Sequence, residues 1–147
     1  ADEQLLASLN SLEVFKLIGL RIVDLKPNWS RLEIDYRPDL CQPLGIMHGG
    51  VIATLIDSGI AYALVLTDVA KRGAGWVSVD LRVKYLRPAS TGTLICESTI
   101  PRLGQKIIHG ESIVRGPDGK EIARGDSIYM VVGQSAERAL NRPGPGP

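Results

Sequence analysis

The sequence predicts an α+β fold in which a curved antiparallel sheet of five or six strands wraps one long helix. One observation behind this prediction is an apolar segment, residues 51–70, which is long enough for a helix of several turns. The other is that most remaining segments alternate apolar and polar residues, as half-buried strands do. The chain has 147 residues, which is the length of one domain.

Two helices are expected. At the N-terminus, apolar residues recur at three- and four-residue spacings and predict an amphipathic helix over about residues 3–19. The central helix is expected over about residues 50–71, and apolar residues occupy every face of its first four turns. We therefore expect this helix to be buried all round. Because a single sheet covers only part of a helix, a second subunit is the simplest source of the remaining cover.

The other segments are strand candidates, and they are residues 21–26, 31–37, 75–87, 93–102, 105–115 and 121–132. In the third candidate, strict alternation places Val77, Val79 and Leu81 on one face, with Ser78 and Asp80 on the other. No repeat or linker divides the chain, so we expect a single domain over residues 1–140. The tail, residues 141–147, alternates glycine with proline at its end and is expected to be disordered.

The composition excludes several classes of function. Lys plus Arg is 17 and Asp plus Glu is 16, and a net charge of +1 argues against nucleic-acid binding. The sequence has neither the ~18 to 20 apolar residues of a membrane span nor the basic start of a secretory signal. Two distant cysteines, Cys41 and Cys96, predict no disulfide framework and a cytoplasmic location. A metal site would take nearly all of the 2 His and 2 Cys, so we expect no metal and no other cofactor.

The strongest candidate for chemistry lies where an irregular segment, residues 38–50, meets the central helix. His48, Gly49 and Gly50 stand at the start of this helix, where the first N–H groups lack helical partners and lie at the positive end of the dipole. Such groups can bind a phosphate or the oxyanion that forms when an ester or thioester carbonyl is attacked. The alternative is that the glycines only let the entering loop pack tightly.

Asp57 is the only acidic or basic residue in the first four turns of the apolar helix. A carboxylate in such a setting needs a partner or a solvated cleft, and it suits a general base. The alternative is that Asp57 lies on a narrow strip of exposed surface or forms a hydrogen bond to a neighbouring loop. Asp57 follows Gly49 by eight residues, or ~12 Å along a helix, whereas one carbonyl group needs both within ~3 Å. If both are catalytic, they come from different subunits, and a dimer has two equivalent sites.

The remaining candidates carry weaker signals. Phosphate groups could be held by Arg82, Lys84, Arg87, Arg102 and Lys106, although solvated strand faces carry the same residues. His109 lies in a strand candidate, away from the other candidates in the sequence, and is expected to be structural or exposed. Cys41 and Cys96 have no neighbouring His that would mark a nucleophile, so we expect both to be inert.

The sequence also resembles a known family. Residues 42–50, Gln-Pro-Leu-Gly-Ile-Met-His-Gly-Gly, followed by Asp57, resemble the signature of hotdog-fold acyl-CoA thioesterases of the phenylacetate-pathway (PaaI-like) type. Residues 77–80 and 85–89 match the family's next strand, and the resemblance covers about residues 15–135. It implies the hotdog fold, homodimers that join sheets edge to edge and often pair into tetramers, and cofactor-free hydrolysis of an acyl-CoA. The acyl group expected here is aryl, phenylacetyl or medium-chain.

The resemblance implies a role for each matching residue. Asp57 matches the catalytic base or nucleophile, and Gly49 matches the residue whose N–H polarises the thioester carbonyl. His48 matches the residue that shapes the loop and assists at the carbonyl, and Ser78 matches a hydroxyl that helps to place the attacking water. Gln42 stands where the family often has Asn, so the amide is kept and a methylene is added. The residues expected to hold the substrate are Gly50, Arg87, Arg102 and Lys106.

Two other functions stay open on the sequence. A hotdog dehydratase or hydratase acts on the acyl chain and needs a His close to an acid. Because His48 and Asp57 are nine residues apart on one helix, that pairing would also have to cross subunits. A non-catalytic acyl-CoA-binding protein is the other possibility, and Gln42 in place of Asn is the feature that leaves room for it.

Overall fold

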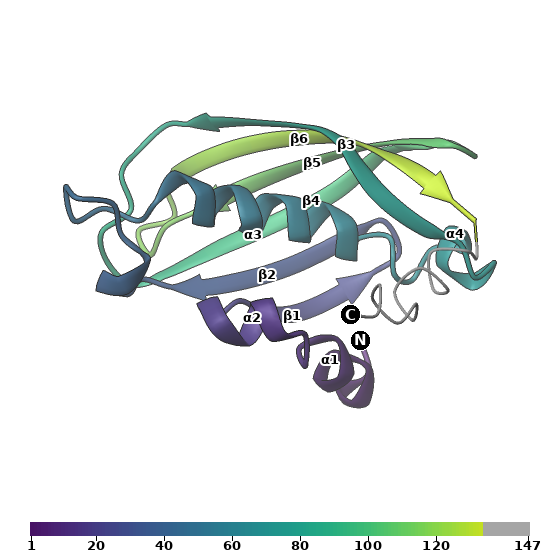
Figure 1. The fold of residues 1–147 in the computed structure, drawn as a ribbon, viewed down its shortest axis with the longest axis horizontal. Coiled ribbons are helices and arrows are strands. Elements are labelled where there is room, and N and C mark those ends of the chain that lie inside the picture. The colour runs from purple at the N-terminus through teal and green to yellow at the C-terminus, as the bar shows by residue number, and fades with distance from the viewer. Residues whose placement is uncertain (134–147) are drawn as a thin grey trace, which may run out of the picture.

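The computed structural model describes residues 1–133, and its main layer is a six-stranded antiparallel sheet. In spatial order the strands are β1 (Arg21–Lys26), β2 (Trp29–Asp35), β4 (Thr93–Leu103), β5 (Ile107–Arg115), β6 (Glu121–Val132) and β3 (Gly75–Tyr85). The helix α3 (Gly49–Tyr62) lies across one face of this curved sheet (Figure 1). The predicted α+β arrangement is therefore confirmed. The tail predicted over residues 141–147 lies outside the described residues.

The helix α3 approaches the sheet closely because small residues line the surface where the two meet. A Cβ atom on Gly110 of β5 would lie 2.2 Å from Cγ2 of Ile60, and one on Gly59 of the helix would lie 2.3 Å from Oγ of Ser98 on β4. The Ser30 hydroxyl on β2 donates a hydrogen bond of 2.6 Å to the carbonyl oxygen of Gly59. Side chains at these two glycine positions would push the helix away, so this close packing depends on glycine.

The central helix is shorter and less covered than the sequence predicts. α3 ends at Tyr62, and a turn separates it from α4 (Asp68–Lys71), so the single helix predicted over residues 50–71 is wrong. In the turn, the Thr67 hydroxyl donates a 2.6 Å hydrogen bond to the carbonyl oxygen of Leu64. This bond occupies a carbonyl oxygen that a continuous helix would bond to its own main-chain N–H. The face of α3 that packs on the sheet is buried at Ile52, Leu55, Ile56, Gly59 and Ile60. The opposite face is only half-buried, so burial all round is wrong for a single chain.

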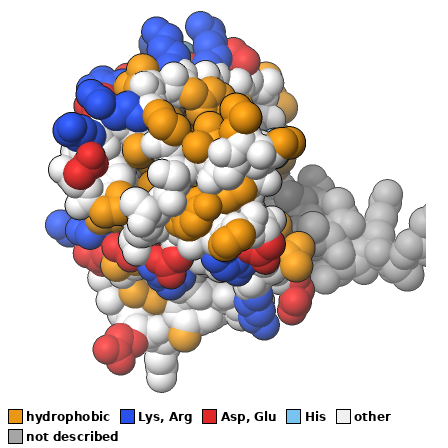
Figure 2. Space-filling view, turned by 90° about the vertical axis from the view of Figure 1, so that its left-hand side faces the viewer, with side chains coloured by type: hydrophobic (Ala, Val, Ile, Leu, Met, Phe, Trp, Pro, Cys, Tyr) orange, Lys and Arg blue, Asp and Glu red, His pale blue; other side chains and the backbone are white. Residues whose placement is uncertain are grey.

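The end of the molecule at which α3 begins is formed by the loops before α3 and after β3 (Figure 1). Hydrophobic side chains gather on this end, and Lys and Arg lie along its border (Figure 2). Leu44 and Leu86, one in each loop, are among the exposed large hydrophobic residues. No helix within residues 1–133 has the length and apolar character that crossing a membrane requires.

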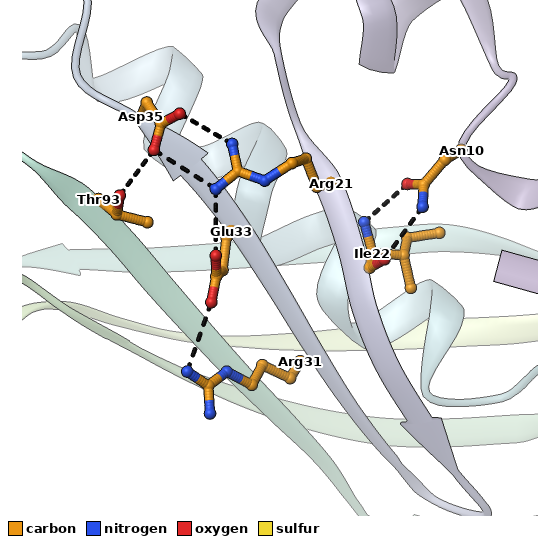
Figure 3. A network of polar contacts seen from close by, with 7 residues as sticks. All are labelled: Asn10, Arg21, Ile22, Arg31, Glu33, Asp35 and Thr93. Carbon is orange, nitrogen blue, oxygen red and sulfur yellow. Dashed lines mark hydrogen bonds and ion pairs between the residues drawn. The ribbon is translucent and has the colours of Figure 1, made fainter. Parts of the chain in front are cut away.

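The N-terminal segment forms two helices, so the single helix predicted over residues 3–19 is wrong. α1 (Glu3–Leu9) and α2 (Glu13–Ile18) lie at the edge of the sheet beside β1 (Figure 1). Between them, the Asn10 side chain accepts a hydrogen bond from the Ile22 N–H at 2.7 Å and donates one to the Ile22 carbonyl oxygen at 3.0 Å (Figure 3). Asn10 thus pairs with β1 as a strand residue would, and this draws the chain out of the helix.

Charged and polar side chains join β1, β2 and β4 near this edge (Figure 3). The Arg21 guanidinium lies 2.9 Å from the Asp35 carboxylate and 3.1 Å from that of Glu33. The Thr93 hydroxyl donates a 2.6 Å hydrogen bond to Asp35. Exposed ion pairs add little stability individually, so this network is a minor addition to the main-chain pairing of the three strands.

The edge strand β3 contains a β-bulge that changes which side chains face α3. Ser78 pairs with Tyr129 of β6 and Asp80 pairs with Ile128, so two steps along β3 match one step along β6. The extra residue, Val79, reverses the alternation, and Ser78 shares the inner face with Tyr129 while Asp80 points outward. The strict alternation predicted across this strand is therefore wrong at Val79.

We expect Gly110→Ala to lower the free energy of unfolding by about 1–3 kcal/mol, as overpacking a core does. The added methyl group would meet Ile60, whose branched side chain has little freedom within a helix. Gly133→Ala is the matched control, because within the described chain no heavy atom lies within 4 Å of a Cβ there. Urea unfolding followed by circular dichroism measures the free energy of unfolding of both variants. An equal decrease in the two variants would contradict the close packing of α3 at Gly110.

Candidate active site

The segment that carries the His-Gly-Gly motif is held from two sides before α3 begins. It follows a short 3-10 helix, η1 (Pro38–Leu40). The His48 N–H donates to the carbonyl oxygen of Leu40 at 2.8 Å, and the Met47 N–H donates to the carbonyl oxygen of Ala89 at 2.7 Å. The motif is therefore clamped between η1 and the loop that follows β3.

His48 caps α3 and determines which N–H groups at the helix start are free. Its Nδ1 atom accepts a hydrogen bond of 2.8 Å from the Gly50 N–H. In a neutral ring with this bond, the proton resides on Nε2. The Gly49 N–H has no acceptor within residues 1–133. Gly49 is thus the free donor at the positive end of the helix, while the N–H of Gly50, a predicted substrate-binding residue, is already used by the cap.

Tyr85, the last residue of β3, holds Gly49 from the side. Its hydroxyl donates a 2.6 Å hydrogen bond to the Gly49 carbonyl oxygen. A Cβ atom at Gly49 would lie 3.1 Å from the Tyr85 ring, so glycine is what allows this contact. The sequence places Tyr85 at a strand end but carries no sign of this contact, which depends on where β3 lies against α3.

A cavity of about 320 Å³ opens beside Gly49. Gln42, Gly49 and Arg87 border it, and the rest of its lining is mainly apolar, formed by Ile46, Met47, Ile52, Tyr85, Leu86, Pro88 and Ala89. The side-chain oxygen of Gln42 accepts a hydrogen bond from the Leu44 N–H, which fixes the amide within its own turn. The amide NH2 group of Gln42 has no acceptor within the described residues, so it is available to a ligand in this cavity.

Asp57 lies eight residues beyond Gly49 on α3, which corresponds to ~12 Å along the helix axis. It is not part of the lining of the Gly49 cavity. Its Oδ1 atom accepts a hydrogen bond from the hydroxyl of Tyr129 on β6, and the same hydroxyl lies 2.8 Å from the Asp57 carbonyl oxygen. A single chain therefore keeps the two halves of the predicted site apart.

Tyr129 is a residue of this region that the sequence does not single out. Burial, and then the hydrogen bond to Asp57, raise the pKa of Tyr129 well above its ordinary value. Tyr129 therefore keeps its proton and acts as a hydrogen-bond donor. A tyrosine on the inner face of the last strand was the only available signal, and its partner on α3 depends on the tertiary fold.

Ser78, another predicted site residue, lies near Tyr129 and not beside the Gly49 cavity. It lies opposite Tyr129 in the β3–β6 register. Its hydroxyl lies 3.2 Å from that of Ser127, and Ser127 donates a 2.8 Å hydrogen bond to the Asp80 carbonyl oxygen within the bulge. Within the described chain, Ser78 makes no hydrogen bond to Asp57 itself.

The predicted basic residues are not gathered at one point. Arg87 borders the Gly49 cavity. Arg102 pairs with His109 across β4 and β5, and Lys106 lies in the turn between these strands. Of Arg87, Arg102 and Lys106, only Arg87 lies beside Gly49.

A sequence profile of the thioesterase superfamily matches residues 44–123, a range that includes Gly49, Asp57 and Ser78. This chain belongs to the thioesterase superfamily. It is 37% identical over 84 residues to acyl-coenzyme A thioesterase 13 of Mus musculus, a match that covers 56% of this chain and 58% of that protein. It is 29% identical over 96 residues to a protein of Saccharolobus solfataricus, covering 65% of this chain and 62% of that protein. The chain thus spans less than two thirds of each of these relatives.

The fold agrees with this family. The PaaI protein from the phenylacetic acid degradation operon of Escherichia coli superposes with a TM-score of 0.77 at 19% identity, covering 86% of this chain and 89% of that one. At this level of identity the likeness concerns the fold alone. It confirms the hotdog fold that the His-Gly-Gly motif predicts.

Neither cysteine is placed as a nucleophile, which gives a direct test by thiol labelling. Burial raises the pKa of the Cys96 thiol to about 11, and Cys41 donates a hydrogen bond of 3.3 Å to the Arg37 carbonyl oxygen. With a thiol-reactive dye near neutral pH, we expect at most one of the two thiols to react in the folded protein and both to react after unfolding. Rapid labelling of both in the folded state would contradict the burial of Cys96.

Proposed function

We propose that this chain is a cofactor-free thioester hydrolase that converts an acyl-CoA to the free acid and CoA. The observation that carries the proposal is that Gly49 borders a cavity and that its N–H, at the positive end of α3, has no acceptor within residues 1–133. A thioester carbonyl in this cavity would accept that hydrogen bond. The N–H would then stabilise the negative charge that develops on the carbonyl oxygen during attack.

The carboxylate in this scheme is Asp57 of a second copy of the chain. It takes a proton from a water molecule whose oxygen attacks the carbonyl carbon, or it attacks that carbon itself to form an anhydride that water opens. In both routes the C–S bond breaks, CoA leaves as a thiolate and takes up a proton, and the acid is released. The ~12 Å between Gly49 and Asp57 on one helix supports this sharing, because both must act on one carbonyl group.

The edge of the sheet at β3 is the surface we propose for this second copy. Within the described chain, β3 has a strand neighbour, β6, on one side only. Val77 is 46% exposed and Val79 is 61% exposed, and such apolar side chains on an open edge suit pairing with another strand. A homodimer with a two-fold axis here would extend the sheet and form two equivalent sites, and a dimer of dimers would follow from a further contact.

The remaining predicted residues have the following proposed roles. The Gln42 amide adds a second donor to the oxyanion, His48 shapes the loop as the cap of α3, and Ser78 helps to place water beside Asp57. Arg87 lies where it would meet a phosphate of CoA leaving the cavity, with Arg102 and Lys106 as further phosphate contacts. The acyl group is proposed to be aryl, phenylacetyl or medium-chain, and the enzyme to act in the cytoplasm.

Asp57→Asn should lower kcat about 10²- to 10⁴-fold, the usual contribution of a general base, because the amide cannot take a proton. Thiol release from phenylacetyl-, benzoyl- and medium-chain acyl-CoA measures this. Asp68→Asn, at an exposed carboxylate on α4, is the matched control and should keep the parental rate. Full activity of Asp57→Asn would contradict the role of Asp57.

Acyl-CoA binding by the parent without thiol release would indicate a binding protein, and hydration of an enoyl-CoA would indicate a hydratase.

The shared site predicts that two inactive variants restore activity when they are mixed. Gly49→Pro removes the free N–H, and proline suits this position because it is the first of α3 and His48 before it is extended, with φ −58° and ψ 132°. When Gly49→Pro and Asp57→Ala chains are co-expressed in equal amounts, half of the dimers are mixed and each has one intact site. We therefore expect about a quarter of the parental activity.

The control for this mixing experiment is a pair of chains that carry Asp57→Ala and Asp57→Asn, which have no intact site in any combination. Gly49→Ala, which keeps the N–H, shows how much of the Gly49→Pro loss comes from crowding Tyr85. If the mixed dimers stay as inactive as the two parents while dimerising normally, each site lies within one chain.

A further inference from the structure

We infer that Tyr129 is a positioning residue for Asp57: its hydroxyl holds one carboxylate oxygen so that the other one faces the substrate. The inference rests on the proposed function, because it assigns Tyr129 a task only if Asp57 acts on a thioester. Tyr129 stands apart from the His-Gly-Gly motif, on the last strand of the sheet.

The contact between the two residues fixes the Asp57 side chain in one orientation. The Tyr129 hydroxyl donates to Oδ1 of Asp57 and also lies 2.8 Å from the carbonyl oxygen of the same residue. One hydroxyl thus holds the carboxylate against its own main chain, which limits rotation about the Cα–Cβ bond. Within residues 1–133, the Oδ2 atom of Asp57 has no hydrogen-bond partner, so it is the oxygen available to water or substrate.

Tyr129 itself is held rigidly, which a positioning role requires. It is only 3% exposed. It pairs with Ile108 of β5 on one side and with Ser78 of β3 on the other, so its strand is held on both edges. A side chain on a doubly paired strand can place a partner more precisely than one on a loop.

The chemistry of the pair favours a donor that never loses its proton. Burial and the Asp57 carboxylate both raise the pKa of Tyr129, so the hydroxyl donates throughout the range in which the enzyme would be assayed. A hydrogen bond to a charged acceptor is stronger than a neutral one, so the carboxylate is held firmly. Phenylalanine at this position would keep the ring in the core and remove only the donor.

The experiment compares Tyr129→Phe with the parent by thiol release from acyl-CoA. We expect kcat to fall about 10- to 100-fold, the effect of a misplaced catalytic group, while KM changes less than about twofold because Tyr129 does not line the Gly49 cavity. Tyr62→Phe is the matched control. Tyr62 packs against Phe15 with ring centroids 5.3 Å apart, and within the described chain its hydroxyl makes no hydrogen bond. This control should keep the parental kcat.

A second comparison separates positioning from a loss of folding. If Tyr129 acts through Asp57, adding Tyr129→Phe to Asp57→Asn should change the residual rate less than about twofold, whereas an independent defect would lower it again by the full factor. A parental kcat in Tyr129→Phe, or a full additive loss in the double variant, overturns the inference while the proposed function stands. If the parent itself releases no thiol from any acyl-CoA, the proposed function fails and the inference falls with it.

Discussion

The close packing of α3 against the inner face of the sheet fixes the positions of the candidate site residues. Gly59 and Gly110 leave no room for a Cβ atom between helix and sheet, and the Ser30 hydroxyl bonds the helix from below. The helix therefore cannot shift or rotate without separating glycine contacts and breaking that bond. The two candidate site residues on this helix are therefore held in fixed positions. Gly49 meets Tyr85 at one end of β3, and Asp57 meets Tyr129 several residues further along the helix.

If Gly49 and Asp57 act at one site, as proposed, a rigid helix explains why a single chain cannot form that site alone. The free N–H of Gly49 and the carboxylate of Asp57 are separated by eight residues of continuous helix, so no loop movement brings them together. The open edge of β3 and the half-buried outer face of α3 are the surfaces where a second copy would supply the missing half. In this proposal, assembly and catalysis depend on the same element.

The bulge in β3 changes which side chains face the candidate site. Val79 is the extra residue, and it turns Ser78 toward Tyr129 and α3 while Asp80 points outward. A regular strand would leave Ser78 outside with the charged residues. The hydrogen bond from Ser127 to the Asp80 carbonyl oxygen stabilises this altered path. The inner face of the sheet near Asp57 is consequently lined by hydroxyl groups, those of Ser78, Ser127 and Tyr129.

Local periodicity and helix geometry predict the fold class, the start of the central helix and the places of His48, Gly49 and Asp57 along it, because these depend on residues that are neighbours in the sequence. The remaining features depend on residues that are far apart in the sequence and that meet in the folded chain. The first helix ends at Asn10 because the Asn10 side chain bonds to Ile22. Ser78 faces inward because β6 pairs with a bulged β3. Tyr129 contacts Asp57 because α3 packs against β6. Each of these contacts joins residues that are far apart in the sequence, so the periodicity of one strand or one helix does not predict them.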